Sequence, residues 1–289
     1  MFVLARKYGR LGNRLRRAAH LVAAAIEHGH TLVDLSFSEY AADFEATRRD
    51  LFCRYPAARH PFPAPWWVRA LLDRLATLAL RIARLVPPPG SLLRVVLWRN
   101  VDVEYRLDSS AFRDLASRSR VLLFEGWTFR TSAVERHAAA IRAHFAPVRA
   151  LAERAQAIAT ALRASAEVLV GVHLRRGDYA TWLGGQYHYS LPAYADLMRR
   201  VRALFPGRRV LFLVCSDEPV PPTTFDGLPY ALGADHPVVD LYALARCDYL
   251  FGPPSSFTLW ASFAGGVPLW FVYRPDAEPS LDAFVRHMP

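Results

Sequence analysis

The chain has 289 residues, of which 53% are apolar, so it is long and apolar enough to fold around a substantial core. Its net charge is +10 with Lys7 as the sole lysine, so the excess is arginine, and without a run of five basic residues it does not indicate nucleic-acid binding. The sequence contains no apolar run that could cross a bilayer, and the four apolar residues before Arg6 are too few for a signal peptide.

The first elements along the chain predict an α/β domain. Residues 2–5 predict a short buried strand, and the glycine-containing segment YGRLGN (8–13) follows as a loop. A helix is expected from Arg14 to about His28, and a second strand over residues 31–35. A strand, a loop, a helix and a further strand in this order are the usual opening of an α/β fold.

A long amphipathic helix is predicted over residues 66–86, between the breakers PFPAP (61–65) and PPPG (87–90). Its charged residues share an arc of about 140° on a helical wheel, and apolar residues cover the rest. They are Arg69, Asp73, Arg74, Arg81 and Arg84. Two interpretations stay open: the helix packs on the core, or it lies on an anionic membrane surface.

The remaining elements alternate between strands and helices. We expect a strand over 121–124, a helical stretch from Ser132 to Ala164 with a break near Pro147, and further strands over 168–174, 209–215, 249–252 and 268–272. Helices are expected near 192–204 and 239–246 and from Ser255 onward. Apolar strands alternating with helices predict parallel, doubly wound sheets. We place one α/β domain over 1–160, with a helical insertion at about 61–90, and a second over 161–289.

The segment GVHLRRGDY (171–179) carries the strongest local signal. A buried strand leads directly into His173, Arg175, Arg176 and Asp178, and ligands of open parallel sheets bind at such carboxyl ends. Alternation along the strand places His173 and Arg175 on one side, and the forked guanidinium suits phosphate oxygens. Arg175 is therefore expected to face the ligand. The alternative is a solvated turn with a surface salt bridge.

Three further segments place polar groups after predicted strands. After the strand 249–252, two prolines lead to Ser255 and Ser256, which open a helix and either cap it or bind an anion at its N-terminus. Asp240 begins the preceding helix, where it is an N-cap or a ligand contact. Asp217 lies in the SDE segment after the strand 209–215. In YGRLGN the two glycines would let backbone N–H groups approach a phosphate or sugar, although this is not a P-loop or dinucleotide fingerprint.

These four segments resemble the motifs of a known family. HLRRGDY resembles the HxRRGDY motif of the α-1,2-fucosyltransferases (glycosyltransferase family 11), within the α-1,2/α-1,6/protein-O-fucosyltransferase superfamily. YGRLGN is similar to the GGLGNQ loop of that family, LFLVCSDE to its FFSDD motif, and DLYALARCDYLFGPPSSFTLWASF to its segment of an apolar strand followed by SSF. The matches occur in the family's order. Arg10 and Arg14 replace a Gly and a Gln of the loop, which concerns the acceptor side more than the donor side.

The resemblance implies a GT-B-like fold of two Rossmann-like domains with a cleft between them and GDP-fucose as donor in the C-terminal one. It implies an inverting transferase that needs no metal or other cofactor and moves fucose to a glycan hydroxyl, with α-1,2 linkage to galactose as the usual outcome. Arg175 would hold the β-phosphate, and Asp240 would bind the guanine edge. The wider binding set comprises His173, Arg176, Asp217, Asp240, Ser255, Ser256 and Phe257 for the donor, with Gly9, Gly12 and Asn13 lining the donor or the acceptor side.

The general base stays open between Asp178, in the arginine motif, and three acidic residues of the first half, Glu39, Asp43 and Glu45. A metal-dependent transferase would need an acidic pair, for which Asp102-Val103-Glu104 and Asp43-Phe44-Glu45 are the candidates. A transferase for a different nucleotide sugar, or a basic membrane-surface protein without catalysis, are further alternatives.

The expected setting is a bacterial enzyme of polysaccharide biosynthesis. Three scattered cysteines, Cys53, Cys215 and Cys247, predict reduced thiols in the cytoplasm and provide no metal-binding pattern. The expected partners are a nucleotide-sugar donor and a glycan acceptor, with peripheral contact to the inner membrane as an open question and no nucleic acid.

Overall fold

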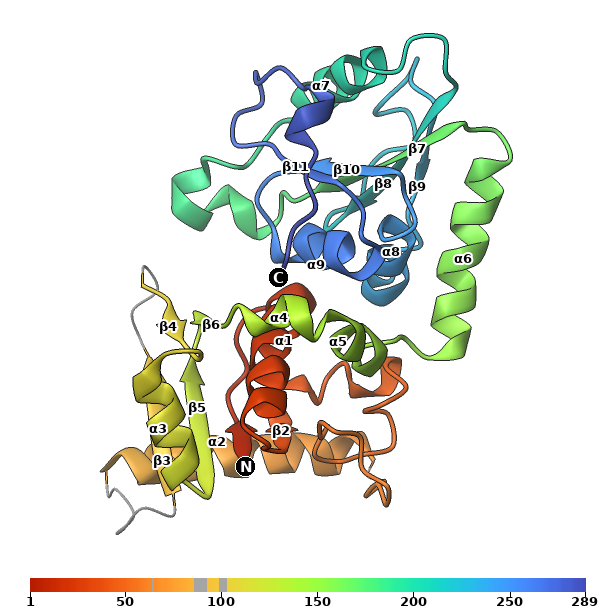
Figure 1. Cartoon of the computed structure of the whole chain (residues 1–289). Helices are drawn as coiled ribbons and strands as arrows, with labels where there is room; N and C mark the ends of the chain where they lie inside the picture. Colours follow the sequence, from red (N-terminus) through yellow and green to blue (C-terminus); the bar gives the residue numbers. More distant parts are fainter. Residues whose placement is uncertain (64, 86–92, 99–102) are drawn as a thin grey trace. The chain divides into compact units, whose positions relative to one another are not determined.

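The computed structural model describes residues 1–63, 65–85, 93–98 and 103–289, and these form two compact units (Figure 1). The first unit comprises residues 1–149 together with Pro289, and the second comprises residues 150–288. Each unit contains its own parallel sheet, so the predicted α/β class with parallel sheets is confirmed.

The sheet of the first unit has the strand order β2-β1-β5-β3, with every pair parallel. Its strands are β1 (Phe2–Leu4), β2 (Leu32–Asp34), β3 (Leu93–Trp98) and β5 (Val121–Gly126). In the register, Phe2 lies opposite Leu32 on one side and Leu122 on the other. Phe2 packs edge-to-face on Phe124 with ring centroids 5.1 Å apart, so the short β1 is fixed at the centre of the core.

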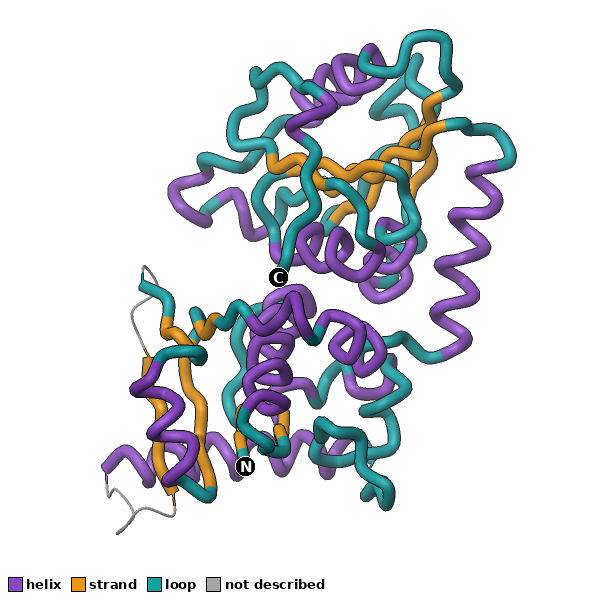
Figure 2. The backbone as a smooth tube through the Cα atoms, in the orientation of Figure 1, coloured by secondary structure: helices purple, strands orange, loops and turns teal. Residues whose placement is uncertain are grey.

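Helices and short segments complete the first unit (Figure 2). They are α1 (Leu11–Glu27), η1 (Leu35–Phe37), η2 (Ala41–Asp43), α2 (Trp66–Leu85), β4 (Tyr105–Arg106), α3 (Ser110–Arg118), β6 (Phe129–Arg130), α4 (Ala133–Arg136) and α5 (Ala138–His144). Helix α1 begins at Leu11, before the expected start at Arg14. Gly12 and Asn13 therefore belong to its first turn and not to the preceding loop.

The sheet of the second unit has the order β11-β10-β7-β8-β9, again parallel throughout. Its strands are β7 (Val168–Leu174), β8 (Val210–Ser216), β9 (Tyr230–Leu232), β10 (Tyr249–Gly252) and β11 (Leu269–Phe271). Its helices are α6 (Arg149–Arg163), η3 (Asp178–Ala180), η4 (Trp182–Gly185), α7 (Leu191–Ala203), α8 (Pro237–Leu244), α9 (Ser256–Gly265) and η5 (Leu281–Ala283). Figure 1 shows α7 on one face of this sheet and α8 and α9 on the other. All seven residues of β7 are buried because helices cover both faces.

The helical stretch expected over 132–164 is three helices, α4, α5 and α6. The expected boundary at residue 160 falls inside α6. Side chains of α6 bond to other parts of the second unit, to which residues 150–163 belong. The Arg163 guanidinium contacts the Asp248 carboxylate at 2.9 Å, and the Arg246 Nε donates to the Gln156 Oε1 at 2.7 Å. The expected breaker PPPG lies outside the described residues, as does one residue of PFPAP.

Candidate functional site

The order of strands in the second unit creates a switch point beside β7. From β7 the chain passes to β8 and β9 on one side, and then crosses to β10 and β11 on the other. Ligands of open α/β sheets bind outside the carboxyl ends of the strands that flank such a point. The flanking ends here are Leu174 of β7 and Gly252 of β10, and a Cβ on Gly252 would lie 2.7 Å from the His173 carbonyl oxygen. The arginine segment and the serine segment therefore begin side by side.

Arg175 follows β7 directly and is held between two carboxylates. Its guanidinium contacts Asp178 Oδ2 at 2.8 Å and Asp217 Oδ2 at 3.1 Å, and its side chain is only 15% exposed. The guanidinium carbon lies 5.5 Å from the centre of the Tyr179 ring. A partly buried guanidinium with a fixed orientation suits recognition of phosphate oxygens. The alternative of a merely solvated turn does not fit this burial.

Asp217 shapes the turn that follows Arg175. Its Oδ1 accepts hydrogen bonds from the backbone N–H groups of Arg176 at 2.9 Å and Gly177 at 3.3 Å. Arg176 is directed to a different acid, since its Nε lies 3.6 Å from Glu218. Asp217, which was expected to bind the donor, thus holds the arginine turn in place within the described residues. The two acids of SDE each pair with one of the two arginines.

Tyr179 connects the arginine turn to the start of α9. Its hydroxyl donates to the Pro254 carbonyl oxygen at 2.5 Å and also shares a hydrogen bond with the Ser255 side chain. Burial raises the pKa of Tyr179 to about 12, so the phenol remains protonated. The structure therefore brings Arg175 and Ser255 to the same small region through the Tyr179 ring.

Ser255 is the N-cap of the ten-residue helix α9, and its Oγ accepts from the Phe257 N–H at 3.2 Å. Ser256, the first helical residue, is half-buried. The first turn of such a helix presents free N–H groups, and its dipole favours an anion. Capping and anion binding are compatible here, because the cap uses one N–H and leaves others.

His173 is buried beneath this helix start. Its ring stacks on Phe257 with centroids 4.9 Å apart and an interplanar angle of 27°. Burial and the nearby Arg175 charge lower the pKa of His173 to about 3, so the imidazole is neutral. Its Nδ1 is buried and has no hydrogen-bond partner among the described residues. A neutral ring with one free nitrogen can exchange a hydrogen bond with a ligand without adding charge.

Asp240 lies in the first turn of α8, but the N-cap of that helix is His236. The capping interpretation of Asp240 is therefore wrong. Its Oδ1 accepts from the Ala234 N–H at 2.6 Å, and burial raises the pKa of its carboxyl group. Gly233 lies against it, since a Cβ there would be 2.6 Å from Oδ1. A buried carboxylate has the capacity to accept several hydrogen bonds, so Asp240 can also accept from a ligand.

The three first-unit residues of the candidate set lie together at the start of α1. Gly9 has φ +62°, and a Cβ on it would meet the Asn13 side chain at 2.3 Å, so this loop conformation requires glycine. Arg14 fixes the loop, because its Nε donates to the Gly9 carbonyl oxygen at 3.2 Å and its guanidinium contacts Glu39 at 2.7 Å. The departure of Arg14 from the family pattern thus has a structural role.

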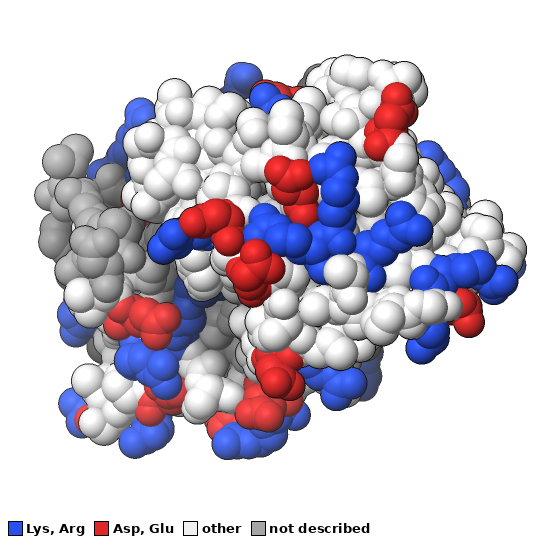
Figure 3. Space-filling view, turned by 90° about the horizontal axis from the view of Figure 1, so that it is seen from above, with Lys and Arg blue, Asp and Glu red and all other residues white. Residues whose placement is uncertain are grey.

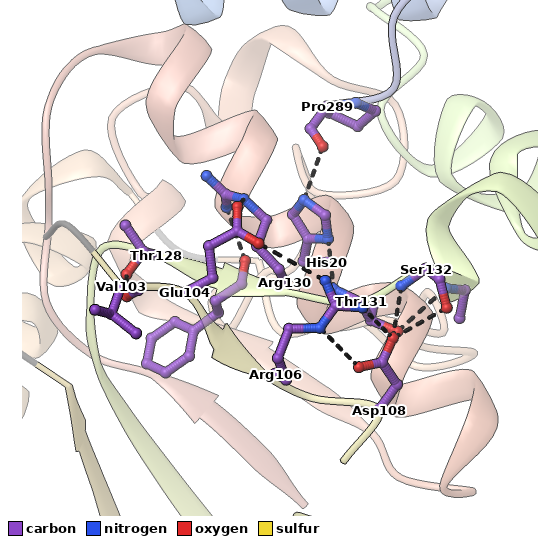
Figure 4. A network of polar contacts seen from close by, with 12 residues as sticks. His20, Val103, Glu104, Arg106, Asp108, Thr128, Arg130, Thr131, Ser132 and Pro289 are labelled. Atoms are coloured by element: carbon purple, nitrogen blue, oxygen red, sulfur yellow. Dashed lines mark hydrogen bonds and ion pairs between the residues drawn. The ribbon is translucent and has the colours of Figure 1, made fainter. Parts of the chain in front are cut away.

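A small arginine-lined cavity of about 10 Å³, room for about one water molecule, lies beside this loop. Its lining residues are Tyr8, Asn13, Arg16, Arg17, Trp127 and Arg130. Burial, and then the neighbouring Arg130, lower the pKa of Arg16 to about 10. Arg130 contacts the Glu104 carboxylate at 3.2 Å (Figure 4).

The acidic pairs considered for a metal have other partners. Asp102 lies outside the described residues, and Glu104 pairs with Arg130. Glu45 contacts Arg48 at 3.0 Å and accepts from the Arg149 N–H at 3.2 Å. Within the described ranges, no group of three His, Cys, Asp or Glu side chains could hold a metal ion.

A larger hollow of about 560 Å³ lies elsewhere on the second unit. It is lined at the C-terminal end of α7 by residues that include Arg199, Arg202 and Arg208. This end of α7 leads into the start of β8, so the hollow lies at the edge opposite to Arg175. Figure 3 shows basic side chains in a band with acidic ones beside them. Many exposed arginines pair with a neighbouring acid, as Arg199 does with Asp196 at 2.5 Å. Such exposed pairs contribute little to stability.

Comparisons with known proteins agree with this fold. No protein-family model and no curated protein matches the sequence. A mutant of Arabidopsis thaliana FUT1 in complex with GDP matches with TM-score 0.60 and 14% identity, over 97% of this chain and 72% of that chain. POFUT1 in complex with GDP-fucose matches with TM-score 0.54 and 14% identity, over 91% and 93%.

The fucosyltransferase NodZ from Bradyrhizobium matches with TM-score 0.54 and 20% identity, over 93% of this chain and 95% of that one. This chain has their fold. The predicted GT-B-like α/β class is therefore confirmed, whereas the cleft between the two domains stays a prediction. Identities this low show the architecture and not the substrate.

The sequence did not predict a role in the site for two tyrosines, Tyr179 and Tyr194. Tyr179 ends the RRGDY motif, so its position was visible, but its bond to Pro254 joins residues 75 positions apart. Tyr194 of α7 accepts at its hydroxyl from the Arg175 backbone N–H at 3.3 Å. Helical periodicity alone marks Tyr194 only as a core residue.

Proposed function

We propose that this chain is an inverting, metal-independent fucosyltransferase that uses GDP-fucose and a glycan hydroxyl, with α-1,2 linkage to galactose as the favoured outcome. One observation carries the proposal: Arg175 and the N-terminus of α9 lie at the switch point beside β7 and are joined by Tyr179. The FUT1 mutant in complex with GDP and POFUT1 in complex with GDP-fucose share this architecture. The four motifs add the resemblance to the α-1,2 family.

In this proposal the second unit binds the donor. Arg175 and the first N–H groups of α9, with Ser255 and Ser256, hold the pyrophosphate. The neutral His173 contributes a hydrogen bond beside it. Asp240 accepts hydrogen bonds from the guanine N1–H and its exocyclic amino group, because a carboxylate has four acceptor sites on its two oxygens. This set gives a preference for guanine over adenine or uracil.

The reaction forms a bond from the acceptor oxygen to the anomeric carbon and breaks the bond from that carbon to the β-phosphate oxygen. The leaving GDP gains negative charge, and Arg175 with the α9 N-terminus stabilises it. The acceptor proton passes to a general base. Asp178 is one candidate, although it is engaged by Arg175; Glu39, Asp43 and Glu45 of the first unit are the others.

The proposal is tested by measuring thermal stability with GDP, UDP, ADP and GDP-fucose. A ligand that binds only the folded state raises the unfolding temperature by mass action, so the guanine ligands are expected to stand out. A response to UDP but not GDP would instead identify a transferase for another nucleotide sugar. Transfer to galactose-terminated acceptors, followed by linkage analysis of the product, then tests the α-1,2 assignment.

The cellular setting is also part of the proposal. We expect a bacterial enzyme that acts in the cytoplasm on the glycan repeats of surface polysaccharides. Detection of the native chain in the soluble and membrane fractions of the source cell checks this placement.

A further inference from the structure

Helix α2 of the first unit exposes a continuous apolar stripe. Five large side chains are half exposed or more: Trp67 57%, Leu71 50%, Leu75 53%, Leu78 52% and Ile82 55%. We call them the α2 stripe. Their spacings of four and three residues place them within about 80° of arc on one helix face. Contiguous apolar surfaces of this kind on soluble proteins mark sites of interaction.

The opposite side of α2 attaches to the unit through polar contacts. The Arg69 guanidinium is buried and donates to the backbone carbonyl oxygens of Asp50 at 2.8 Å and Thr47 at 3.3 Å. Asp73 contacts the Lys7 ammonium at 3.1 Å. Arg69 and Asp73 thus face the rest of the unit, whereas the α2 stripe faces away from it. The interpretation that this apolar face packs on the core is wrong for the stripe.

The charged residues of α2 at the edge of the stripe, within the described side chains, are arginines. Arg74 and Arg81 are exposed and lie at its edge, within about 40° of Trp67 on the helical wheel. The single acidic residue of α2 is Asp73, which is already paired with Lys7 on the inward side. An exposed apolar face flanked by arginines, with a tryptophan near its end, is the pattern of helices that lie in a membrane interface.

We infer that α2 docks the protein on an anionic lipid surface, with the α2 stripe entering the interface and Arg74 and Arg81 contacting lipid headgroups. In the part of the chain that the structure describes, no helix is long and apolar enough to cross a membrane. The inference goes beyond glycosyl transfer and does not depend on it.

A second copy of the chain fits this face less well than lipid does. The exposed area of the stripe is on the order of 500 Å², below the ~800 Å² per partner of a standard interface. A twofold pairing of the two helices would also bring Arg74 and Arg81 close to their own copies. Lipid headgroups offer the opposite charge.

Vesicle co-sedimentation tests the inference with the full-length chain. Vesicles of phosphatidylcholine with 30 mol% phosphatidylglycerol are compared with phosphatidylcholine alone. We expect binding to the anionic vesicles, weakened by added salt. Because each half-exposed leucine contributes by burial, Leu71→Gln with Leu78→Gln should weaken binding by about tenfold or more. Arg74→Gln with Arg81→Gln should weaken it by about 30-fold on anionic vesicles only.

The matched control is Leu281→Gln with Met288→Gln, two residues of the second unit that are 46% and 44% exposed. This control should bind like the parent. All variants must unfold cooperatively near the parental temperature, which establishes that the fold is intact without reference to activity. Unchanged binding in the Leu71/Leu78 variant, or no binding of the parent, would overturn the inference. A dimer in sedimentation velocity that the same variant dissociates, without vesicle binding, would assign the stripe to a second copy instead.

Discussion

Replacement of Arg175 by alanine separates its role in turnover from its role in the fold. The side chain joins the carboxylates of Asp178 and Asp217, which are 48% and 8% exposed. Removal of one electrostatic donor from a developing anion typically lowers the rate by about 100-fold or more, which is about 2.7 kcal/mol. We therefore expect Arg175→Ala to release GDP from GDP-fucose at least about 100-fold more slowly at saturating donor.

The expected loss of stability is smaller than that of a fully buried ion pair. Breaking such a pair costs about 3–5 kcal/mol because the remaining charge is left alone. Asp217 retains the N–H groups of Arg176 and Gly177, so we expect Arg175→Ala to lose about 1–2 kcal/mol in urea unfolding. Adding Asp217→Asn removes the carboxylate charge that Arg175 faced and keeps an oxygen that accepts both bonds. The double variant should regain part of the stability and none of the turnover.

Arg163→Ala is the control. Arg163 contacts Asp248 at 2.9 Å, and this ion pair does not lie at the carboxyl ends of the strands. It should keep the parental rate. The assignment of Arg175 to the pyrophosphate would be refuted by parental turnover in a folded Arg175→Ala protein. Recovery of turnover in the double variant would be equally damaging, because it would mean that Arg175 acts only through the charge balance of the turn.

Four further outcomes are expected. GDP affinity should rise as the pH rises through the raised pKa of the buried Asp240, because guanine binds the ionised carboxylate. Calorimetric titration should show that Asp240→Asn binds GDP more weakly and that its affinity no longer depends on pH in this range. His20, His144 and His173 are buried, with pKa values lowered to about 3, 4 and 3, so only the unfolded chain takes up their protons below pH 6.5. Stability should therefore fall by about 1 kcal/mol per histidine per pH unit from pH 6.5 toward 4, as urea unfolding can measure. Burial raises the pKa of the Cys53 thiol to about 12, so a thiol reagent should modify it only after denaturation. Turnover should be unchanged by EDTA, and a loss restored by Mg²⁺ or Mn²⁺ would revive a metal-dependent mechanism.

The sequence predicted the strands that are short, continuous apolar runs. VLVGVHL became β7 and YLFG became β10 because such runs can be buried on both faces. Strand β3 was missed, because its LRVVLW carries Arg94 and only Val96 of the strand is buried. The early start of α1 was missed because Gly9 and Gly12 suggested a loop, whereas burial of Gly12 against the unit favours the helix.

The sequence predicted which polar residues follow the strand ends, but it did not predict the contacts among them. Strand ends and helix starts placed Arg175, Ser255 and Asp240 at one edge of the sheet, since parallel strands share a direction. The contacts of Asp217 with the arginine turn and of Tyr179 with Pro254 depend on how two distant loops meet. Local propensity carries no information about such long-range pairs.

The arginines of this chain show why net charge alone is a poor guide to function. Arg14, Arg17 and Arg69 are buried and donate to backbone carbonyl oxygens, so they fix loops of the first unit. Exposed arginines of the second unit are largely paired with neighbouring acids, as Figure 3 illustrates. What distinguishes Arg175 is its position after a buried strand, beside a helix N-terminus, and what distinguishes Arg74 is its place beside an exposed apolar stripe. The arginines thus divide into a structural group, a solvated group and the few that our proposals assign to a nucleotide or a membrane.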